Sequence, residues 1–289
     1  MSCDTFASLR GPVAVIGAGT MGHGIAQVAA MAGCETRLFD VDPAARERAL
    51  ERVRTNLERG VELARVEPAT RDAALGRLTA TGDPAEAATG ADLVIEAVPE
   101  DLDLKRRVLS EFAALVGATA VLASNTSSLS ISRIGAGVPG PERVVGLHFF
   151  NPVHIMALVE VVRGDRTAER VVEQARQFAE SLGKEPIVVN DSPGFASSRL
   201  GVAIGLEAIR MLESGVASAP DIDRAMELGY RHPMGPLRLT DLVGLDVRLE
   251  IARYLHAELG ERFRPPALLE RLVEEGKLGR KTGQGFYTW

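Results

Sequence analysis

Three kinds of feature are scarce in this chain of 289 residues. It has only two cysteines, Cys3 and Cys34, and their spacing is not that of metal ligands, so we expect two reduced thiols, no disulfide framework and no metal site. No apolar run approaches the ~18 residues that span a bilayer, and no basic segment precedes an apolar stretch near the first residue. We therefore expect neither a membrane protein nor a secreted disulfide scaffold, and we expect a cytoplasmic location.

An excess of one charge is also lacking. The chain carries 33 basic and 39 acidic residues, a net charge of -6, and neither sign gathers into a long run. A nucleic acid partner is not expected, because the chain has no basic stretch that would follow a phosphate backbone. What the chain does have is 46% hydrophobic residues and a length that suits one large domain or two ordinary ones.

Short apolar runs alternate with helical patterns up to about Asn190, which predicts a parallel sheet with crossover helices. The expected strands are Val13–Ile16, Thr36–Phe39, Leu93–Ala97, Ala120–Ser124, Val144–His148, Leu158–Val162 and Ile187–Val189. Several of these runs are apolar throughout, as is typical of strands covered on both faces. We therefore expect residues 1–190 to form an α/β domain of the Rossmann type with a mostly parallel sheet.

Helical periodicity replaces the β-rich runs in residues 191–289, which predicts an all-helical C-terminal domain. The expected helices run from Ser192-Pro193 to about Gly215, from Ser218 to Gly229, from Gly235-Pro236 toward Gly260, and from Pro265-Pro266 to about Gly276. The apolar stripe of the first helix is expected to include Leu200, Ile204 and Met211.

The segment Gly17-Ala18-Gly19-Thr20-Met21-Gly22 follows the first expected strand directly and leads into a helix at Ile25–Met31. Its three glycines suit a dinucleotide-binding loop: the first permits a tight turn, the second lets the backbone approach a pyrophosphate, and the third lets helix and strand pack closely. Asp40 ends the second strand, where a carboxylate accepts hydrogen bonds from a ribose 2′-hydroxyl and repels a 2′-phosphate. The pattern therefore predicts NAD as the cofactor.

His148 ends an expected strand, at the sheet edge where open α/β folds bind their ligands. Histidine has the basicity to take a proton from an alcohol near neutral pH. Glu160 lies in an otherwise apolar strand, where a carboxylate is costly unless it is paired. A hairpin through Pro152–Met156 would bring Glu160 to the imidazole. The alternative is that His148 is structural and that Glu160 faces solvent or an arginine.

A cluster of small polar residues, Ser124-Asn125-Thr126-Ser127-Ser128, follows another strand and offers hydroxyl groups at the same edge. Such clusters are also common as turns or helix caps, so the residues alone leave both interpretations open.

Several segments match, in order, the motifs of a known family. They are the Gly17–Gly24 loop, Glu96-Ala97-Val98-Pro99-Glu100, Ser124–Leu129, His148–Pro152 with Glu160, Asp191–Phe195, His232–Pro236 and Lys281–Tyr287. Over almost its whole length the chain resembles the L-3-hydroxyacyl-CoA dehydrogenases, most closely the stand-alone 3-hydroxybutyryl-CoA type.

This resemblance implies roles for individual residues. His148 matches the family's general base, Glu160 its carboxylate partner, and Ser127 the serine near the substrate hydroxyl and the nicotinamide. The residues implied to contact NAD, besides the glycine loop and Asp40, are Glu96, Asn151 and Lys281, and Asn151 is also implied to position the substrate.

The resemblance also implies the reaction and the partners. The expected reaction is the reversible oxidation of a (3S)-3-hydroxyacyl-CoA to the 3-oxoacyl-CoA with NAD, a step of fatty acid metabolism, with the acyl-CoA thioester lying between the two domains. Members of the family are homodimers joined through their helical domains.

The chain departs from the family at two places. Ser198 stands where the family commonly has an asparagine shortly after its proline-glycine-phenylalanine motif, so the resemblance makes Ser198 a candidate catalytic residue. A serine is shorter and offers one hydroxyl donor instead of an amide. In the helical arm Pro43–Arg65, Asn56 and Leu63 stand where relatives place serine and lysine against the CoA nucleotide, so no contacts to that nucleotide are assigned.

Two other functions fit part of the pattern. A dehydrogenase of a free sugar acid, resembling L-gulonate 3-dehydrogenase, would share the loop and the histidine motif. A non-catalytic NAD-binding protein, such as a redox sensor or a relative of lambda-crystallin, would share the loop but would not need His148 with Glu160.

Overall fold

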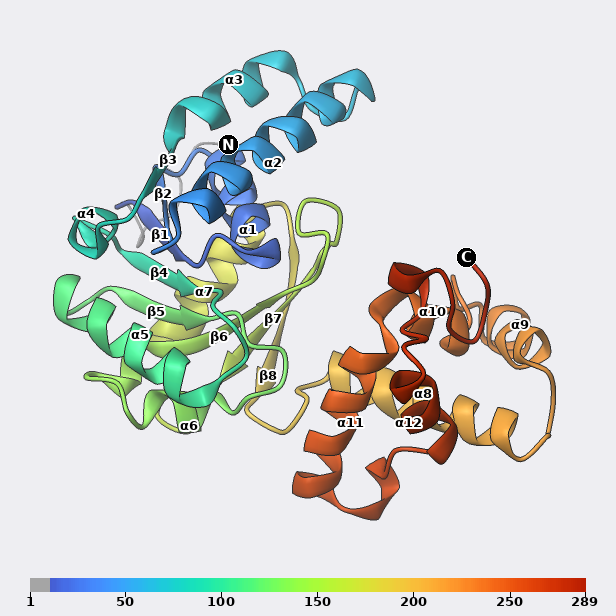
Figure 1. The fold of residues 1–289 in the computed structure, drawn as a ribbon. Coiled ribbons are helices and arrows are strands. Elements are labelled where there is room, and N and C mark those ends of the chain that lie inside the picture. Colours follow the sequence, from blue (N-terminus) through green and yellow to red (C-terminus); the bar gives the residue numbers. More distant parts are fainter. Residues whose placement is uncertain (1–10) are drawn as a thin grey trace. The chain divides into compact units, whose positions relative to one another are not determined.

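The computed structural model describes residues 11–289, so Cys3 lies outside the described residues. Figure 1 shows the chain as two compact units, which divide after Asp191; the second unit is Ser192–Trp289. The first unit combines helices with a sheet, and the second is built from helices. The predicted fold class is confirmed, and each unit is described by itself below.

The first unit is built on an eight-stranded sheet with the order β3-β2-β1-β4-β5-β6-β7-β8. Its strands are β1 (Val13–Ile16), β2 (Thr36–Phe39), β3 (Leu78–Thr81), β4 (Leu93–Glu96), β5 (Val121–Ser124), β6 (Val144–Phe149), β7 (Leu158–Arg163) and β8 (Glu185–Asn190). All neighbouring strands pair in parallel except β6 and β7, which are antiparallel. Strand β3 was not predicted, because it lies at the sheet edge with two of its four residues buried and has no continuous apolar run.

Helices cover both faces of this sheet (Figure 1). They are α1 (Thr20–Met31), α2 (Pro43–Glu62), α3 (Pro68–Arg77), α4 (Pro84–Ala88), α5 (Leu102–Leu115), α6 (Ile131–Gly135) and α7 (Glu169–Ser181). Apolar residues of α1, α2, α3 and α7 share one buried cluster with alternate residues of the strands, as expected when successive side chains of a strand point to opposite faces. Helix α1 begins at Thr20, directly after the glycine loop, earlier than the predicted Ile25.

The second unit contains α8 (Ser197–Glu213), α9 (Ala219–Tyr230), α10 (Pro236–Val243), α11 (Leu245–Leu259) and α12 (Ala267–Glu274). Two predictions are corrected. The first helix begins at Ser197, not at Ser192-Pro193, because Gly194 and Phe195 both have positive φ angles, 73° and 49°, and form a turn. The helix expected from Gly235-Pro236 toward Gly260 is two helices, broken where Gly244 adopts a φ of 109°.

The predicted apolar stripe of α8 was right for Met211, which packs against the core of the second unit, and wrong for Leu200 and Ile204. Leu200 and Ile204 are 63% and 38% exposed, whereas Val202, Leu206 and Ile209 are buried and pack in the core of the second unit. Val202 and Leu206 repeat the spacing of Leu200 and Ile204 two positions further along the helix, so periodicity alone did not distinguish the core face from a second apolar face.

The described residues contain no helix that is both long and apolar enough to cross a membrane. In residues 11–289 no group of histidine, cysteine and acidic side chains is arranged to hold a metal ion.

Candidate active site

The glycine loop joins β1 to α1 and has the geometry of a phosphate cradle. Gly17 has a φ of 101°, and a Cβ there would lie 2.8 Å from the carbonyl oxygen of Ala97. A Cβ on Gly22 would lie 1.7 Å from the carbonyl oxygen of Gly17, so only glycine lets the helix start so close to the strand. A Cβ on Gly19 would meet nothing within 4 Å, so this part of the backbone is open to a ligand.

Two further features of the loop fit a dinucleotide. Helix α1 begins after Gly19 without a side-chain cap, which leaves its N-terminal amides and its dipole for an anion such as a pyrophosphate. Asp40 follows β2, where its Oδ2 accepts a hydrogen bond from the amide of Ala18 at 2.8 Å and its Oδ1 accepts one from Asp42 at 3.0 Å. A carboxylate has about four acceptor positions, so Asp40 can hold the loop and still accept from a ribose hydroxyl.

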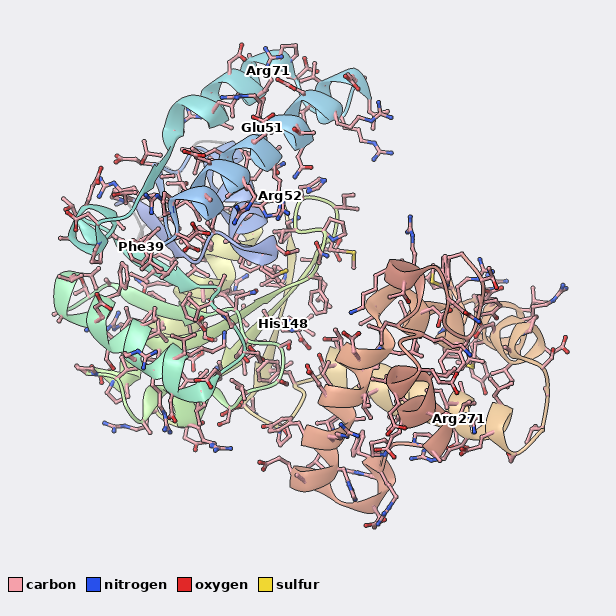
Figure 2. All side chains as sticks on the ribbon, in the orientation of Figure 1. Phe39, Glu51, Arg52, Arg71, His148 and Arg271 are labelled. Carbon is pink, nitrogen blue, oxygen red and sulfur yellow. The ribbon has the colours of Figure 1, made fainter. Side chains whose placement is uncertain are left out.

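His148 and Glu160 occupy opposite positions on the antiparallel strands β6 and β7. His148 Nδ1 lies 2.7 Å from Glu160 Oε2, with the histidine 6% exposed and the glutamate fully buried. The imidazole ring also packs against Phe150, with ring centroids 4.4 Å apart (Figure 2 labels His148 at the end of β6). An ionised carboxylate accepts but does not donate, so the neutral imidazole carries its proton on Nδ1 and presents the basic lone pair on Nε2.

The loop after β5 is held beside the end of β6. The side-chain oxygen of Asn125 accepts a hydrogen bond from the amide of Phe149 at 2.9 Å, which ties the loop containing Ser127 to the residue after His148. The polar cluster Ser124–Ser128 thus runs from the end of β5 into this loop, and it lies at the same edge of the sheet as His148.

Glu100 gathers this polar loop around one carboxylate oxygen. Its Oε1 accepts hydrogen bonds from the Thr126 hydroxyl at 2.6 Å, the Ser127 amide at 3.1 Å and the Ser127 hydroxyl at 3.3 Å. Its Oε2 lies 3.3 Å from Lys105 Nζ. Burial raises the pKa of Glu100, but the charge of Lys105 and the bonds from Thr126 and Ser127 outweigh it, so the pKa lies below its usual 4.5.

Lys105 and Glu96 form a fully buried ion pair behind this loop. Lys105 Nζ lies 3.1 and 3.0 Å from the two carboxylate oxygens of Glu96 and 3.1 Å from the carbonyl of Val98. The Ser124 hydroxyl also donates to Glu96. Burial raises the pKa of Glu96, and the charge of Lys105 and the bond from Ser124 offset this only in part.

The contact of Glu96 with NAD stays a prediction. Glu96 is fully buried, and its carboxylate oxygens accept hydrogen bonds from Lys105 and Ser124. Glu100, four residues later, is the acidic side chain at the surface of the site, 38% exposed.

Asn151 lies on the exposed loop between β6 and β7. Lys184 holds this loop by donating to the carbonyl oxygens of Val153 at 2.6 Å and Met156 at 2.9 Å. Burial lowers the pKa of Lys184.

The remaining expected site residues belong to the second unit. Ser198 lies in the first turn of α8, and Lys281 forms an ion pair of 2.5 Å with Asp246 at the start of α11. Their roles at the site stay predictions.

Sequence reasoning missed the Glu100 and Lys105 positions. Glu160 was identified as a carboxylate within an apolar strand. Glu96 in Leu93–Ala97 shows the same pattern, which predicts a buried cation near it. Lys105 is that cation, but its burial on α5 becomes visible only when the strand and the helix pack together.

The unit therefore combines a dinucleotide cradle with one base that a buried carboxylate orients. The cradle fits NAD, whose nicotinamide accepts a hydride. A histidine at the same sheet edge is positioned to take or return the proton of an alcohol.

Comparisons with known proteins agree with this geometry. Residues 12–192 match the family profile described as 3-hydroxyacyl-CoA dehydrogenase, NAD binding domain, and residues 194–289 match the profile of the same family's C-terminal domain. A 3-hydroxybutyryl-CoA dehydrogenase of Mycobacterium tuberculosis is 46% identical over 96% of this chain and 98% of its own. A 3-hydroxyadipyl-CoA dehydrogenase of Escherichia coli is 42% identical over 96% of this chain and 58% of its own. The crystal structure of M. tuberculosis FadB2 has a TM-score of 0.93 and 45% identity, covering 98% of this chain and 99% of that one.

Proposed function

The chain belongs to the 3-hydroxyacyl-CoA dehydrogenase family, and we propose that it acts on short-chain 3-hydroxyacyl-CoA thioesters with His148 as the general base. It is an NAD-dependent oxidoreductase that oxidises a 3-hydroxyacyl-CoA. The observation that carries the proposed role of His148 is its 2.7 Å contact with the buried Glu160 beside the dinucleotide loop.

In the oxidation, Nε2 of His148 takes the proton of the C3 hydroxyl, and the buried carboxylate of Glu160 stabilises the imidazolium that forms. In the reverse direction the imidazolium returns this proton to the oxygen of the 3-oxo group. When bound, NAD would accept the hydride from C3 in the oxidation, and NADH would return it in the reverse direction.

Other residues hold the reacting groups. The Ser127 hydroxyl, held by Glu100, lies beside the reacting oxygen, and Asn151 positions substrate and NAD. The glycine loop and Asp40 hold the pyrophosphate and the adenosine ribose. In the second unit, Ser198 is a candidate catalytic residue and Lys281 a candidate NAD contact. The second unit also binds the substrate and forms the dimer.

Two relatives differ in the acyl chain of their names, butyryl in one and adipyl in the other. The M. tuberculosis relative matches over 96% of this chain and 98% of its own, and its name supports the short, uncharged C4 chain as a substrate.

We propose further that the protein is a cytoplasmic homodimer joined through its second unit. Exposed apolar side chains of that unit support a partner surface: Leu200 on α8 and Leu239, Leu242 and Val243 on α10. Sedimentation should show a dimer mass, and Leu200→Asp should shift it toward the monomer. A monomer of the unsubstituted protein would contradict this assignment.

The test of the activity is the oxidation of NADH on addition of acetoacetyl-CoA, followed by absorbance. We expect turnover with acetoacetyl-CoA and none of NAD with gulonate. Turnover only with gulonate would instead support a sugar acid dehydrogenase, and NADH binding without turnover of either substrate would support a sensor.

A further inference from the structure

The side chain of Arg248 is a buried cation that has no hydrogen-bond or ion-pair partner within residues 11–289. Arg248 lies on α11 and is 9% exposed, and its Nε is fully buried. Burial lowers the pKa of its guanidinium to about 10, which still leaves it charged at neutral pH. Buried charges in proteins are normally paired, so Arg248 is a candidate partner for an anionic group of a ligand.

The guanidinium faces a place on α8 that has no side chain. A Cβ on Gly201 would lie 3.0 Å from Arg248 Nη1, so the arginine head lies directly against the backbone of this turn. Ser198 lies three residues earlier on α8, which puts it on the same side of the helix as Gly201. The hydroxyl of Ser198, the gap at Gly201 and the cation of Arg248 thus line one side of the helix.

The distance between Ser198 and Gly201 sets the length of the acyl chain that could bring an anionic group to Arg248. Ser198 and Gly201 are separated by nearly one helical turn, about 5 Å, which is also about the length of three to four carbon–carbon bonds. If Ser198 lies near C3 of the substrate, a group three carbons further along the acyl chain reaches Arg248. The planar fork of a guanidinium matches a carboxylate, which accepts two parallel hydrogen bonds.

We propose that Arg248 is a specificity residue that binds a carboxylate at the far end of the acyl chain, so that the enzyme also accepts 3-hydroxyacyl-CoA thioesters of short dicarboxylic acids. This inference rests on the proposed function, because it extends the acyl site from the C4 chain to a charged C6 chain. The glycine at position 201 lets the guanidinium lie against α8, one turn from Ser198, because any larger residue there would displace it.

The test compares two substrates of equal length, 3-oxohexanoyl-CoA and 3-oxoadipyl-CoA, which differ only in a terminal methyl or carboxylate. Both are reduced with NADH, and acetoacetyl-CoA reports the basal activity. We expect kcat/KM for 3-oxoadipyl-CoA to exceed that for 3-oxohexanoyl-CoA by about 10- to 100-fold, the effect of a charge-assisted hydrogen bond. The CoA phosphates are common to both thioesters and cancel in the ratio.

Three variants test whether Arg248 causes the preference for 3-oxoadipyl-CoA. Arg248→Met should remove the preference by lowering kcat/KM for 3-oxoadipyl-CoA alone, and Arg248→Lys should keep part of it. Gly201→Ala should also reduce the preference, because its Cβ would crowd the guanidinium, the flexible end of a side chain that can move aside. Arg253→Met, on the same helix but exposed and paired with Glu270, is the matched control and should change nothing.

Each contrary outcome has a distinct meaning. Equal kcat/KM for the two C6 substrates, or a preference that survives in Arg248→Met, overturns the role of Arg248. If Arg248→Met lowers the activity on all substrates equally and reduces the mass of the oligomer, Arg248 pairs with an acidic group of a second copy of the chain, and the proposal is wrong. Absence of activity on acetoacetyl-CoA in the unsubstituted protein would instead refute the proposed function.

Discussion

His148 Nδ1 and Glu160 Oε2 lie 2.7 Å apart across the antiparallel strands β6 and β7. Residues directly opposite on antiparallel strands have Cβ atoms about 5 Å apart, so the pairing itself sets this contact, and no loop has to adjust to make it. The rigid hairpin thus orients the imidazole, and the two residues act as a unit. The first two predictions test the two members of this unit separately.

Replacing His148 with alanine should lower kcat by about 10²- to 10⁴-fold, the usual contribution of a positioned general base, while NADH still binds. Turnover with acetoacetyl-CoA and a fluorescence titration with NADH measure the two properties. His256→Ala is the control, since His256 lies on α11 and its imidazole contacts Glu261 at 3.2 Å, away from the dinucleotide loop in the sequence and in a different unit. Unchanged turnover in His148→Ala would refute the role of the base.

Replacing Glu160 with glutamine keeps the size of the side chain but removes its charge. The amide can donate to Nδ1, which would move the imidazole proton to Nε2 and leave no base on the substrate side. We expect kcat to fall by at least about 10²-fold, as when a triad carboxylate is replaced by its amide. Glu160→Asp, which keeps the charge, should recover part of the activity; if Glu160→Gln is fully active, the carboxylate does not set the tautomer.

Local patterns in the sequence were enough to predict most of this arrangement. The strands of the sheet, the glycine loop and the carboxylate in β7 follow from short apolar runs, turn chemistry and the cost of burying a charge. A histidine at the end of one strand and a carboxylate in the next, joined by the short connection Pro152–Met156, were sufficient to predict the contact between His148 and Glu160.

Features that depend on packing could not be predicted in this way. Strand β3 has no apolar run because it lies at the edge, and the turn at Phe195 needs a positive φ that phenylalanine rarely adopts. The burial of Lys105 and Arg248 depends on which face of a helix meets its neighbour, and a lysine or arginine in a helical pattern is normally expected to face solvent.

Asp40 should decide between NAD and NADP. Its carboxylate lies at the end of β2 and already holds the loop amide of Ala18, so Asp40→Ala removes both the ribose acceptor and one support of the loop. We expect KM for NAD to rise by about tenfold or more, as for a lost hydrogen bond to a charged group, and the ratio of NAD to NADP efficiency to fall further. Asp42→Ala is the control; an unchanged cofactor ratio in Asp40→Ala would contradict the assignment.

Glu100 should stabilise the folded protein at neutral pH and lose this stabilising effect in acid. Its pKa in the folded protein lies below 4.5, so the unfolded chain binds the proton more readily, and the stability that Glu100 provides is present above pH 4.5 and lost as the pH falls through its folded pKa. Glu100→Gln lacks this contribution, so it should be less stable than the unsubstituted protein at neutral pH, with the difference shrinking below pH 4.5. Glu96, whose pKa is raised, has the opposite dependence but is present in both proteins.

Urea unfolding at several pH values measures this difference. Glu58→Gln, an exposed position on α2, is the control and should leave the pH dependence unchanged. A difference between Glu100→Gln and the unsubstituted protein that stays constant from neutral to acid pH would show that the carboxylate is not held by Lys105 and the Ser127 loop.

Asp241 should anchor the last residues of the chain. It is fully buried, and its carboxylate accepts hydrogen bonds from the amides of Phe286 and Tyr287 at 2.8 and 2.9 Å and from the indole of Trp289 at 2.8 Å. In Asp241→Asn the amide nitrogen would face these donors, so at least one bond is lost. At about 1.5–3 kcal/mol for each charge-assisted bond, the unfolding midpoint of the second unit should fall by roughly 8 °C or more.

Trp289 is the only tryptophan of the chain, so its fluorescence reports on this segment alone. In Asp241→Asn we expect its emission to shift to longer wavelength below the unfolding midpoint, because the indole loses its partner and gains water. Glu274→Gln, exposed on α12, should change neither the midpoint nor the emission. An Asp241→Asn variant with native emission and a native midpoint would mean that the C-terminal segment is held by the stacking of Arg238 on Tyr287 and Trp289, and not by the buried carboxylate.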